Sequence, residues 1–399
     1  MKKRNNVQII MTIIITALIT FSITSLYIYG KAKKQKDGET IIGSAIESDE
    51  VSTKLKLIKE KIQANFMGDI DEEKLKEYSI KGYVAGLDDE YSQYFTKEEM
   101  KKYTENTLGN YVGIGVYMVK NTEKHAVEVH KVMKNSPAEE VGMKKGDLIT
   151  KVDERNITDE DFEKVSDWIE GKEGTQVNVV VTRENNEISY NITRKKIMVP
   201  NVESQMFENN IGYIYISSFD GDTSKEFKTE YDKLVNQGMN ALILDLRNNG
   251  GGIANEAVEI GDFFTEKGQK LLIQSDKNGK EEISYSKNNA EITMKTVVLV
   301  NGYSASASEI LAGICKELVD NATLVGTKTY GKGVIQSLYS LTDGSGLKLT
   351  TDKYFTPNHN DIHKKGIEPD IQTEEYKFTE ELDKENDLQL KKAIEVLTQ

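Results

Sequence analysis

The longest hydrophobic stretch of the chain lies at its N-terminus. Residues 5–30 contain no charged side chain, and their hydrophobic part, residues 7–29, is long enough to span a bilayer as a helix. Basic residues at positions 2–4 precede it, which favours a cytoplasmic N-terminus. A cleaved signal peptide is the alternative, but no small-x-small cleavage site follows. We therefore predict an uncleaved single-pass anchor in the cell membrane over residues 1–30, a polar linker over residues 31–50, and an extracytoplasmic remainder.

Apolar residues at helical spacing follow this linker and return at the end of the chain. The first stripe consists of Val51, Leu55, Ile58, Ile62 and Phe66. A second helix is predicted over residues 72–87, which gives a helical region over residues 51–103. The final stripe, within residues 376–399, consists of Leu388, Leu390, Ile394 and Leu397. It predicts a C-terminal amphipathic helix.

Residues 104–196 alternate short strands with turns. Alternating apolar positions at residues 177–181 and 188–192 predict a hairpin that turns through Asn185-Asn186. A Gly-rich stretch at residues 113–116 lies earlier, and Ser136-Pro137 opens a short helix. The segment that follows, residues 197–375, contains apolar runs at residues 211–216, 241–246 and 296–300 that predict buried strands.

The last of these runs leads into a serine-rich turn. Ser304, Ser306 and Ser308 precede apolar residues at helical spacing, with Glu309 in the first helical turn. At such a strand-to-helix turn, free backbone N–H groups point outward and favour negative charge. Acyl transfer by a serine needs this environment and also a base for the hydroxyl proton.

A lysine is the predicted base. The four histidines do not lie in a comparable strand-turn or Gly-rich setting, whereas Lys332 is flanked by two glycines. A buried lysine can be neutral and so accept a proton. A strand beginning at Lys332 would place Gln336 on the same face, where its amide could hold the lysine amine. The alternative is that the serines only cap a helix and the Gly-Lys-Gly segment only makes a turn.

Together these two segments resemble the carboxyl-terminal processing peptidases, also called tail-specific proteases. The matching residues are Ser304-Ala305-Ser306-Ala307-Ser308-Glu309-Ile310 and Thr329-Tyr330-Gly331-Lys332-Gly333-Val334-Ile335-Gln336. The resemblance implies that Ser306 is the nucleophile, Lys332 the general base and Gln336 the residue that orients the lysine. It also implies a crotonase-like α/β protease core.

A Gly-rich loop after residue 246 has two interpretations. A strand, a Gly-rich loop and a helix could bind phosphate, but the Walker Lys-Ser/Thr and the Gly-x-Gly-x-x-Gly spacing are absent. The stretch Asp245-Leu246-Arg247-Asn248-Asn249-Gly250-Gly251-Gly252 instead resembles a loop of the same family, with Gly250 in place of a proline. The resemblance implies that the backbone N–H groups of Gly251 and Ala307 form the oxyanion hole.

Residues 104–196 resemble a PDZ domain (α+β), and the resemblance implies that Gly113, Ile114, Gly115 and Val116 bind a C-terminal carboxylate. Exposed N–H groups of a Gly-rich loop can hold a carboxylate while a peptide adds a strand. Residues 80–95 resemble the helical N-terminal region of the family, with Glu90 at a proline position. There this region contributes to dimerisation, so we expect a homodimer.

Composition and charge limit the partners. The formal net charge of −13 argues against nucleic acid, and the single cysteine, Cys315, excludes an internal disulfide. His359, Asp361 and His363 could suit a metal by spacing, but they lie in a polar stretch after Pro357 that predicts a solvated loop. We predict neither a metal nor another cofactor.

The complete interpretation is a multidomain α/β chain. It predicts a membrane-anchored serine endopeptidase that cleaves protein or peptide substrates near their free C-termini with a Ser-Lys dyad. The PDZ domain would capture the substrate or gate the active site. The alternative is an inactive, membrane-tethered PDZ scaffold that only binds protein C-termini. The sequence does not identify the physiological substrate or the pathway, whether sporulation signalling or envelope maintenance.

Overall fold

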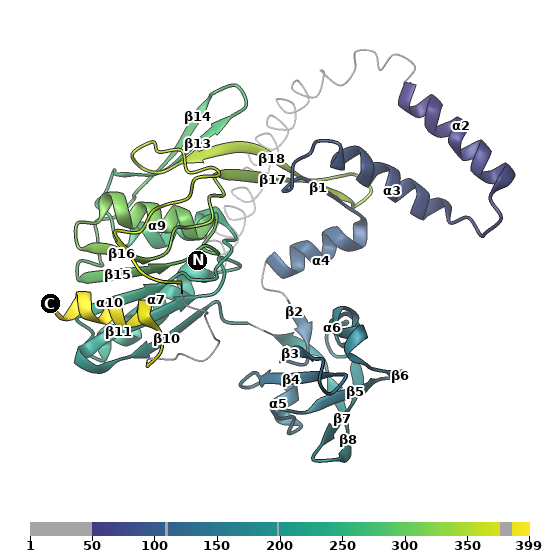
Figure 1. Cartoon of the computed structure of the whole chain (residues 1–399), viewed down its shortest axis with the longest axis horizontal. Helices are drawn as coiled ribbons and strands as arrows, with labels where there is room; N and C mark the ends of the chain where they lie inside the picture. The colour runs from purple at the N-terminus through teal and green to yellow at the C-terminus, as the bar shows by residue number, and fades with distance from the viewer. Residues whose placement is uncertain (1–49, 108–110, 198, 376–384) are drawn as a thin grey trace, which may run out of the picture. The chain divides into compact units, whose positions relative to one another are not determined.

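The computed structural model describes residues 50–107, 111–197, 199–375 and 385–399 (Figure 1). They belong to two compact units, Met1–Lys76 and Glu77–Gln399. The predicted anchor over residues 1–30 lies outside the described residues and stays a prediction. Within the described ranges, no helix combines the length and the apolar character that crossing a membrane requires.

The two helices predicted after the linker are present in the structure. Helix α2 (Glu50–Asn65) lies in the first unit, and α3 (Glu72–Ala85) begins there. The side chains of Lys59 and Gln63 on α2 both bind the carboxylate of Glu72. The predicted apolar stripe is present on α2, but Leu55 and Ile58 remain 45% and 47% exposed. Amphipathic spacing therefore predicted the helix correctly, although the apolar face remains about half exposed among the described residues.

Residues 111–197 form a small domain with its own hydrophobic core. Its sheet has the order β3-β4-β5-β7-β8, with β6 on β5, and β2 pairs with β9. The elements are β2 (Tyr111–Gly113), β3 (Val116–Asn121), β4 (Ala126–Val132), α5 (Pro137–Glu140), β5 (Leu148–Val152), β6 (Arg155–Asn156), η1 (Asp159–Asp161), α6 (Phe162–Ile169), β7 (Gln176–Arg183), β8 (Asn186–Thr193) and β9 (Lys195–Ile197). The predicted hairpin is β7–β8, and Ser136 caps α5 as expected. Residues 104–107, which we expected to be strand or turn, instead end helix α4 (Lys97–Thr107).

The largest domain is built on a six-stranded sheet of order β10-β11-β12-β15-β16-β19, parallel except for the β10–β11 pair. Residues alternate between two cores: Leu242 and Val298 pack on one face with helix residues of α7, α8 and α9, and Ile243 and Val297 pack on the other face with α10. Burial on both faces explains the continuous apolar runs in these strands. The elements are β10 (Val202–Met206), η2 (Glu208–Asn210), β11 (Ile211–Ile216), α7 (Thr223–Asn236), β12 (Ala241–Asp245), α8 (Ala254–Asp262), β15 (Lys295–Val300), α9 (Ala307–Leu318), β16 (Ala322–Gly326), β19 (Ile371–Gln372) and α10 (Leu388–Thr398).

A second sheet carries the segment after Lys332. Its order is β1-β18-β13-β14, and β17 also pairs with β18. The strands are β1 (Gln93–Phe95), β13 (Lys270–Asp276), β14 (Glu281–Tyr285), β17 (Val334–Ser340) and β18 (Gly346–Phe355). Because β1 pairs with residues 346–348 of β18, the chain just before β1 is fixed close to the β17–β18 hairpin.

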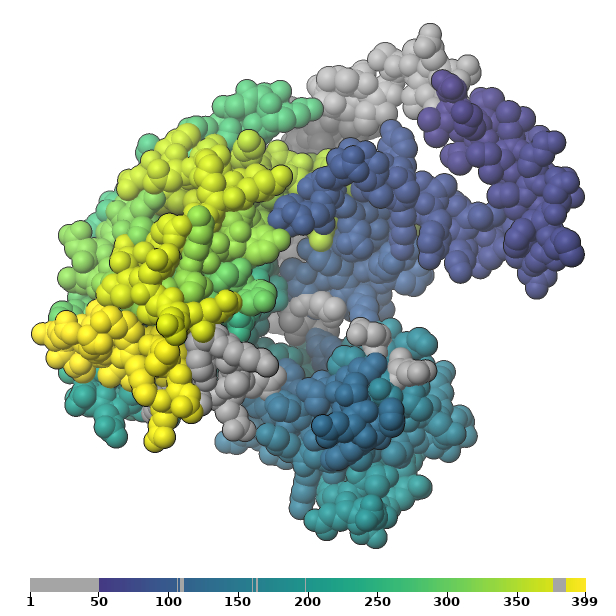
Figure 2. Space-filling model, viewed as in Figure 1, coloured from purple at the N-terminus to yellow at the C-terminus, as the bar shows by residue number. Residues whose placement is uncertain are grey.

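The C-terminal helix is fastened by a buried arginine. Arg247 is 1% exposed and binds Asp245, the last residue of β12. Its Nη1 also donates to Asp387 Oδ1 at 3.0 Å and to Gln389 Oε1 at 3.1 Å. A buried charge needs such partners because desolvation of an unpaired ion is costly. The predicted amphipathic helix is confirmed as α10, which lies at the surface of the domain (Figure 2), and residues 376–384 of the predicted segment lie outside the described residues.

Candidate active site

Two of the three clustered serines, Ser304 and Ser308, use their hydroxyls to bind the neighbouring loop. Ser304 Oγ donates to Leu246 O at 2.8 Å, and Ser308 Oγ donates to Asn249 O at 2.8 Å. Both of these serines are fully buried, whereas Ser306 is partly exposed. The two flanking serines therefore fasten the turn to the loop at residues 246–249 and leave Ser306 at its tip.

The backbone of Ser306 is strained. It is the N-cap of α9 and has φ 56° and ψ −115°, which non-glycine residues rarely adopt. Such conformations cost about 1–3 kcal/mol and persist only where the surrounding structure enforces them. The flanking contacts of Ser304 and Ser308 provide that enforcement.

The carboxylate of Glu309 connects this turn to the segment that carries Lys332. Glu309 is fully buried. Its Oε2 accepts hydrogen bonds from the backbone nitrogens of Ser306 at 3.0 Å and Lys332 at 2.8 Å. Its Oε1 accepts from Thr329 Oγ1 at 2.6 Å and Gly331 N at 2.7 Å. One buried anion thus holds the two predicted catalytic segments at a fixed separation.

The lysine amine faces an aromatic ring in this arrangement. Lys332 Nζ lies 4.6 Å from the ring centroid of Tyr91, and among the described residues no hydrogen bond joins it to Ser306 Oγ. Burial and, to a smaller extent, the charge of Lys348 lower the pKa of Lys332, whereas Glu90, Asp89 and Glu309 act in the opposite direction. The lowered pKa favours the neutral amine that a general base requires.

Within the described residues, Gln336 does not bind the Lys332 amine as the strand periodicity predicted it would. Strand β17 begins at Val334, so Lys332 precedes the strand that we expected it to start. The amide nitrogen of Gln336 donates to Thr350 Oγ1 on β18 at 3.2 Å, and among the described residues no hydrogen bond joins it to Lys332. The two glycines around Lys332 keep the chain out of a regular strand, because Gly331 has φ 94° and packs against the backbone at residues 364–366.

The two predicted oxyanion donors are neighbours. A Cβ on Gly251 would lie 2.7 Å from Ser306 Cβ and 3.0 Å from Ala307 N, so only glycine fits here. Ala307 is the first residue of α9, and its N–H therefore has no acceptor within the helix. The N–H of Gly251, however, donates to Asn249 Oδ1 at 2.9 Å. For Gly251 to serve an oxyanion, the Asn249 side chain has to release this N–H group.

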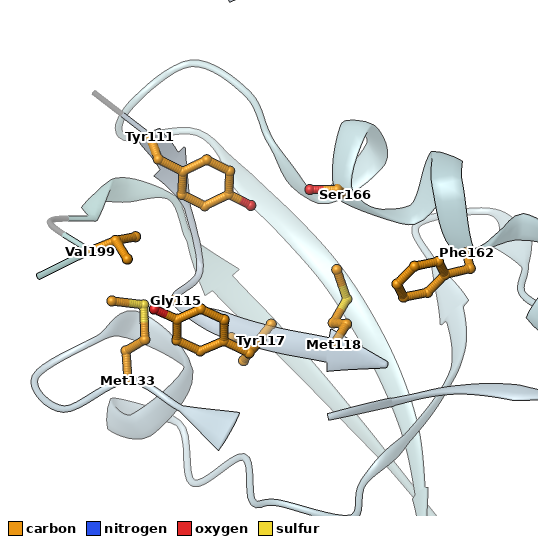
Figure 3. A pocket seen from close by; sticks show the side chains of 9 residues that line it. Tyr111, Gly115, Tyr117, Met118, Met133, Phe162, Ser166 and Val199 are labelled. Carbon is orange, nitrogen blue, oxygen red and sulfur yellow. The ribbon is translucent and has the colours of Figure 1, made fainter. Parts of the chain in front are cut away.

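The small domain contains a groove of about 340 Å³ between β3 and α6 (Figure 3). Gly115 and Val116 line it, but Gly113 and Ile114 do not. The Ile114 side chain is fully buried in the domain core, and its carbonyl accepts from Ala138 N. The remaining lining residues are Tyr111, Tyr117, Met118, Met133, Phe162, Ser166 and Val199. The groove is thus mainly apolar beside the Gly-rich loop, which suits an extended peptide.

The spacing of His359, Asp361 and His363 could suit metal ligands. In the part of the chain that the structure describes, no group of three potential metal ligands is found. His359 Nε2 lies 2.7 Å from Glu281 Oε1, and Asp361 binds Lys365. His363 N donates to Asp361 Oδ1 and so closes a local turn.

Sequence reasoning missed two residues of this site. Glu309 was noted only as an acidic residue in a first helical turn, although Ser306-x-x-Glu309 has the spacing of a capping box. The contact of Tyr91 with Lys332 spans more than 200 positions, and no local pattern signals it.

Three family models match this chain. The model of peptidase family S41 matches residues 210–373, a PDZ domain model matches residues 128–183, and a model of the activating protease CtpB N-terminal domain matches residues 13–99. The carboxy-terminal processing protease CtpA of Bacillus subtilis (strain 168) is 34% identical over 374 residues, which cover 93% of this chain and 78% of that protein. A CtpA-like serine protease of Staphylococcus aureus (strain MSSA476) is 36% identical over 371 residues, covering 92% and 72%.

A solved S41 protease structure from Bacteroides fragilis NCTC 9343 shares the fold, with a TM-score of 0.51, 16% identity and coverage of 80% of this chain and 90% of that one. The matches to the two protease relatives extend over most of both sequences and include the segments around Ser306 and Lys332. The chain therefore belongs to the S41 family of carboxy-terminal processing serine proteases and contains a PDZ domain.

Proposed function

We propose that this protein is an endopeptidase that cleaves protein substrates near their C-termini, with Ser306 as nucleophile and Lys332 as general base. The observation that carries this proposal is the connection through Glu309, which binds the backbone of both residues. Supporting it, Ser306 has a partly exposed side chain and adjoins the N–H group of Ala307.

In the proposed first step, neutral Lys332 Nζ takes the proton of Ser306 Oγ while Oγ bonds to the substrate carbonyl carbon. The N–H groups of Ala307 and Gly251 stabilise the oxyanion. The C–N bond then breaks, and Lys332 returns the proton to the leaving amine. Water hydrolyses the resulting ester by the same proton transfers, which regenerate Ser306.

Two groups must move before this step. The Lys332 amine has to leave the ring of Tyr91, and the Gly251 N–H has to leave Asn249 Oδ1. In the proposed active arrangement, the Gln336 amide oxygen accepts a hydrogen bond from the Lys332 amine and orients it.

Single substitutions test the dyad. Ser306→Ala and Lys332→Arg should each lower kcat/KM on an unfolded protein by at least about 10³-fold. The first removes the nucleophilic hydroxyl, and in the second arginine cannot release its proton to act as a base. In the wild type, kcat/KM should rise with pH to a plateau, since only neutral Lys332 acts, and its apparent pKa should lie below the ordinary value of 10.5. Steady-state kinetics from pH 6 to 10.5 measures both. Full activity of Lys332→Arg would disprove the dyad and indicate another base, whereas a wild type without peptidase activity would favour the inactive scaffold.

We also propose that the PDZ domain restrains the active site until a substrate C-terminus occupies its groove. The groove beside Gly115 and Val116 supports capture of a free carboxylate and an apolar terminal side chain. Delivery without restraint is the other role that this groove could have, because a bound end raises the local substrate concentration.

Removal of residues 104–196 distinguishes these two roles. If the domain gates, the deletion should raise basal cleavage of an unfolded substrate several-fold and abolish the difference between free and amidated C-termini. If it only delivers, the deletion should lower the rate to that of the amidated substrate. The measurement is the initial rate of the wild type and of the deletion variant on the substrate with a free and with an amidated C-terminus. Equal rates in all four combinations would rule out both gating and delivery.

We further propose that residues 1–30 anchor the enzyme in the cell membrane with its domains outside, as the uncharged stretch at residues 5–30 suggests. The full chain should stay in the membrane fraction after high-pH carbonate washing, whereas a chain beginning at residue 31 should be released. Protease added to intact cells should degrade the domains. Release of the full chain by carbonate would contradict the anchor.

A further inference from the structure

Lys332 has an aromatic partner that the proposed reaction does not use. Its Nζ lies 4.6 Å from the centroid of the Tyr91 ring, within the range at which an ammonium group is attracted to the face of an aromatic ring. Tyr91 precedes β1, far from Lys332 in the sequence. The contact therefore depends on how the chain before β1 is held.

A chain of hydrogen bonds fixes the turn that presents Tyr91. Asp89 Oδ2 accepts from Ser92 Oγ at 2.5 Å, and Ser92 Oγ accepts from the backbone nitrogen of Thr350 at 3.1 Å. Thr350 Oγ1 in turn accepts from Gln336 Nε2 at 3.2 Å. The turn is thus attached to β18, and through Thr350 to the residue proposed to orient the lysine.

The surroundings keep the ring neutral. Burial, followed by the neighbouring Glu90 carboxylate, raises the pKa of the Tyr91 phenol well above its usual value, and Tyr330 adds to this effect. The ring therefore attracts Lys332 through its π-face and not through a phenolate charge. The ionisable groups that act on the Lys332 amine are Lys348 on β18, Asp89 and Glu90 before β1, and Glu309 on α9.

Cation–π attraction acts on the ammonium ion and is lost when the amine becomes neutral. Protonated Lys332 is therefore held on Tyr91, where the described residues show no hydrogen bond from it to Ser306 Oγ, whereas the neutral amine is free to accept the proton of Ser306 Oγ. We propose that Tyr91 is a positioning residue that competes with Ser306 for the Lys332 amine and holds it at rest while it is protonated. This inference rests on the proposed role of Lys332 as base.

Two substitutions separate the ring from its hydroxyl. Tyr91→Leu keeps apolar cover over the amine but removes the π-face. Tyr91→Phe, the matched control, keeps the ring and removes only the hydroxyl near Glu90 and Tyr330. Both are made in the full-length enzyme, and kcat/KM is measured against pH on one unfolded protein substrate.

Tyr91→Leu should lower the apparent pKa of kcat/KM by about 0.5 to 1, because the protonated amine loses its partner. The rate on the acid side of the profile should then rise about 3- to 10-fold, with an unchanged plateau. Tyr91→Phe should keep the wild-type profile. A loss of rate at every pH without a change in apparent pKa would overturn the inference, as would a Phe variant that behaves like the Leu variant.

A second readout does not depend on catalysis. In a Ser306→Ala background, the pH dependence of Lys332 acetylation by acetic anhydride, followed by mass spectrometry, gives the pKa of its amine. Tyr91→Leu should lower this pKa even if Lys332 is not the base. A lowered labelling pKa with an unmoved rate profile would mean that the contact exists but the proposed dyad is wrong. An unmoved labelling pKa would disprove the contact with Tyr91 whatever the kinetics show.

Discussion

The carboxylate of Glu309 is the interaction on which the proposed site depends. Ser306 begins a helix of the main sheet domain, whereas Lys332 precedes a strand of the second sheet, so neither sheet alone fixes their separation. Glu309 accepts four hydrogen bonds from these two segments, and the carboxylate is fully buried. A buried anion is stable only when such donors surround it. Separation of the two segments would remove donors from this carboxylate and is therefore energetically costly.

Around this fixed frame, the reacting groups are not yet engaged. The amine of Lys332 lies on Tyr91, and the N–H of Gly251 is bound to Asn249. Both contacts are made by side chains, so both can exchange without unfolding the frame that Glu309, Ser304 and Ser308 maintain. The site thus combines a rigid backbone with side chains that can move, which is compatible with the proposed control by a substrate C-terminus.

Much of the secondary structure could be predicted from local sequence patterns, because these patterns reflect short-range interactions. The apolar runs predicted strands β11, β12 and β15, and helical spacing predicted α2, α9 and α10, since periodicity records which face is buried. Helix α6 was missed because it is short. The partners of Arg247 and Lys332, which are Asp387 and Tyr91, come from distant parts of the chain, and only tertiary structure brings them together.

The most direct test of the central claim replaces Glu309 by glutamine and compares the result with Glu317→Gln. Glu317 lies on the same helix and also accepts several hydrogen bonds, from Thr356, Asn358 and Asn360. Glu309→Gln should lower kcat by about 10²-fold or more, because a displacement near 1 Å between reacting groups has that effect, whereas Glu317→Gln should change only the melting temperature. A Glu309→Gln enzyme with wild-type kcat, or equal loss of kcat in both variants, would contradict the claim that this carboxylate sets the geometry of Ser306 and Lys332.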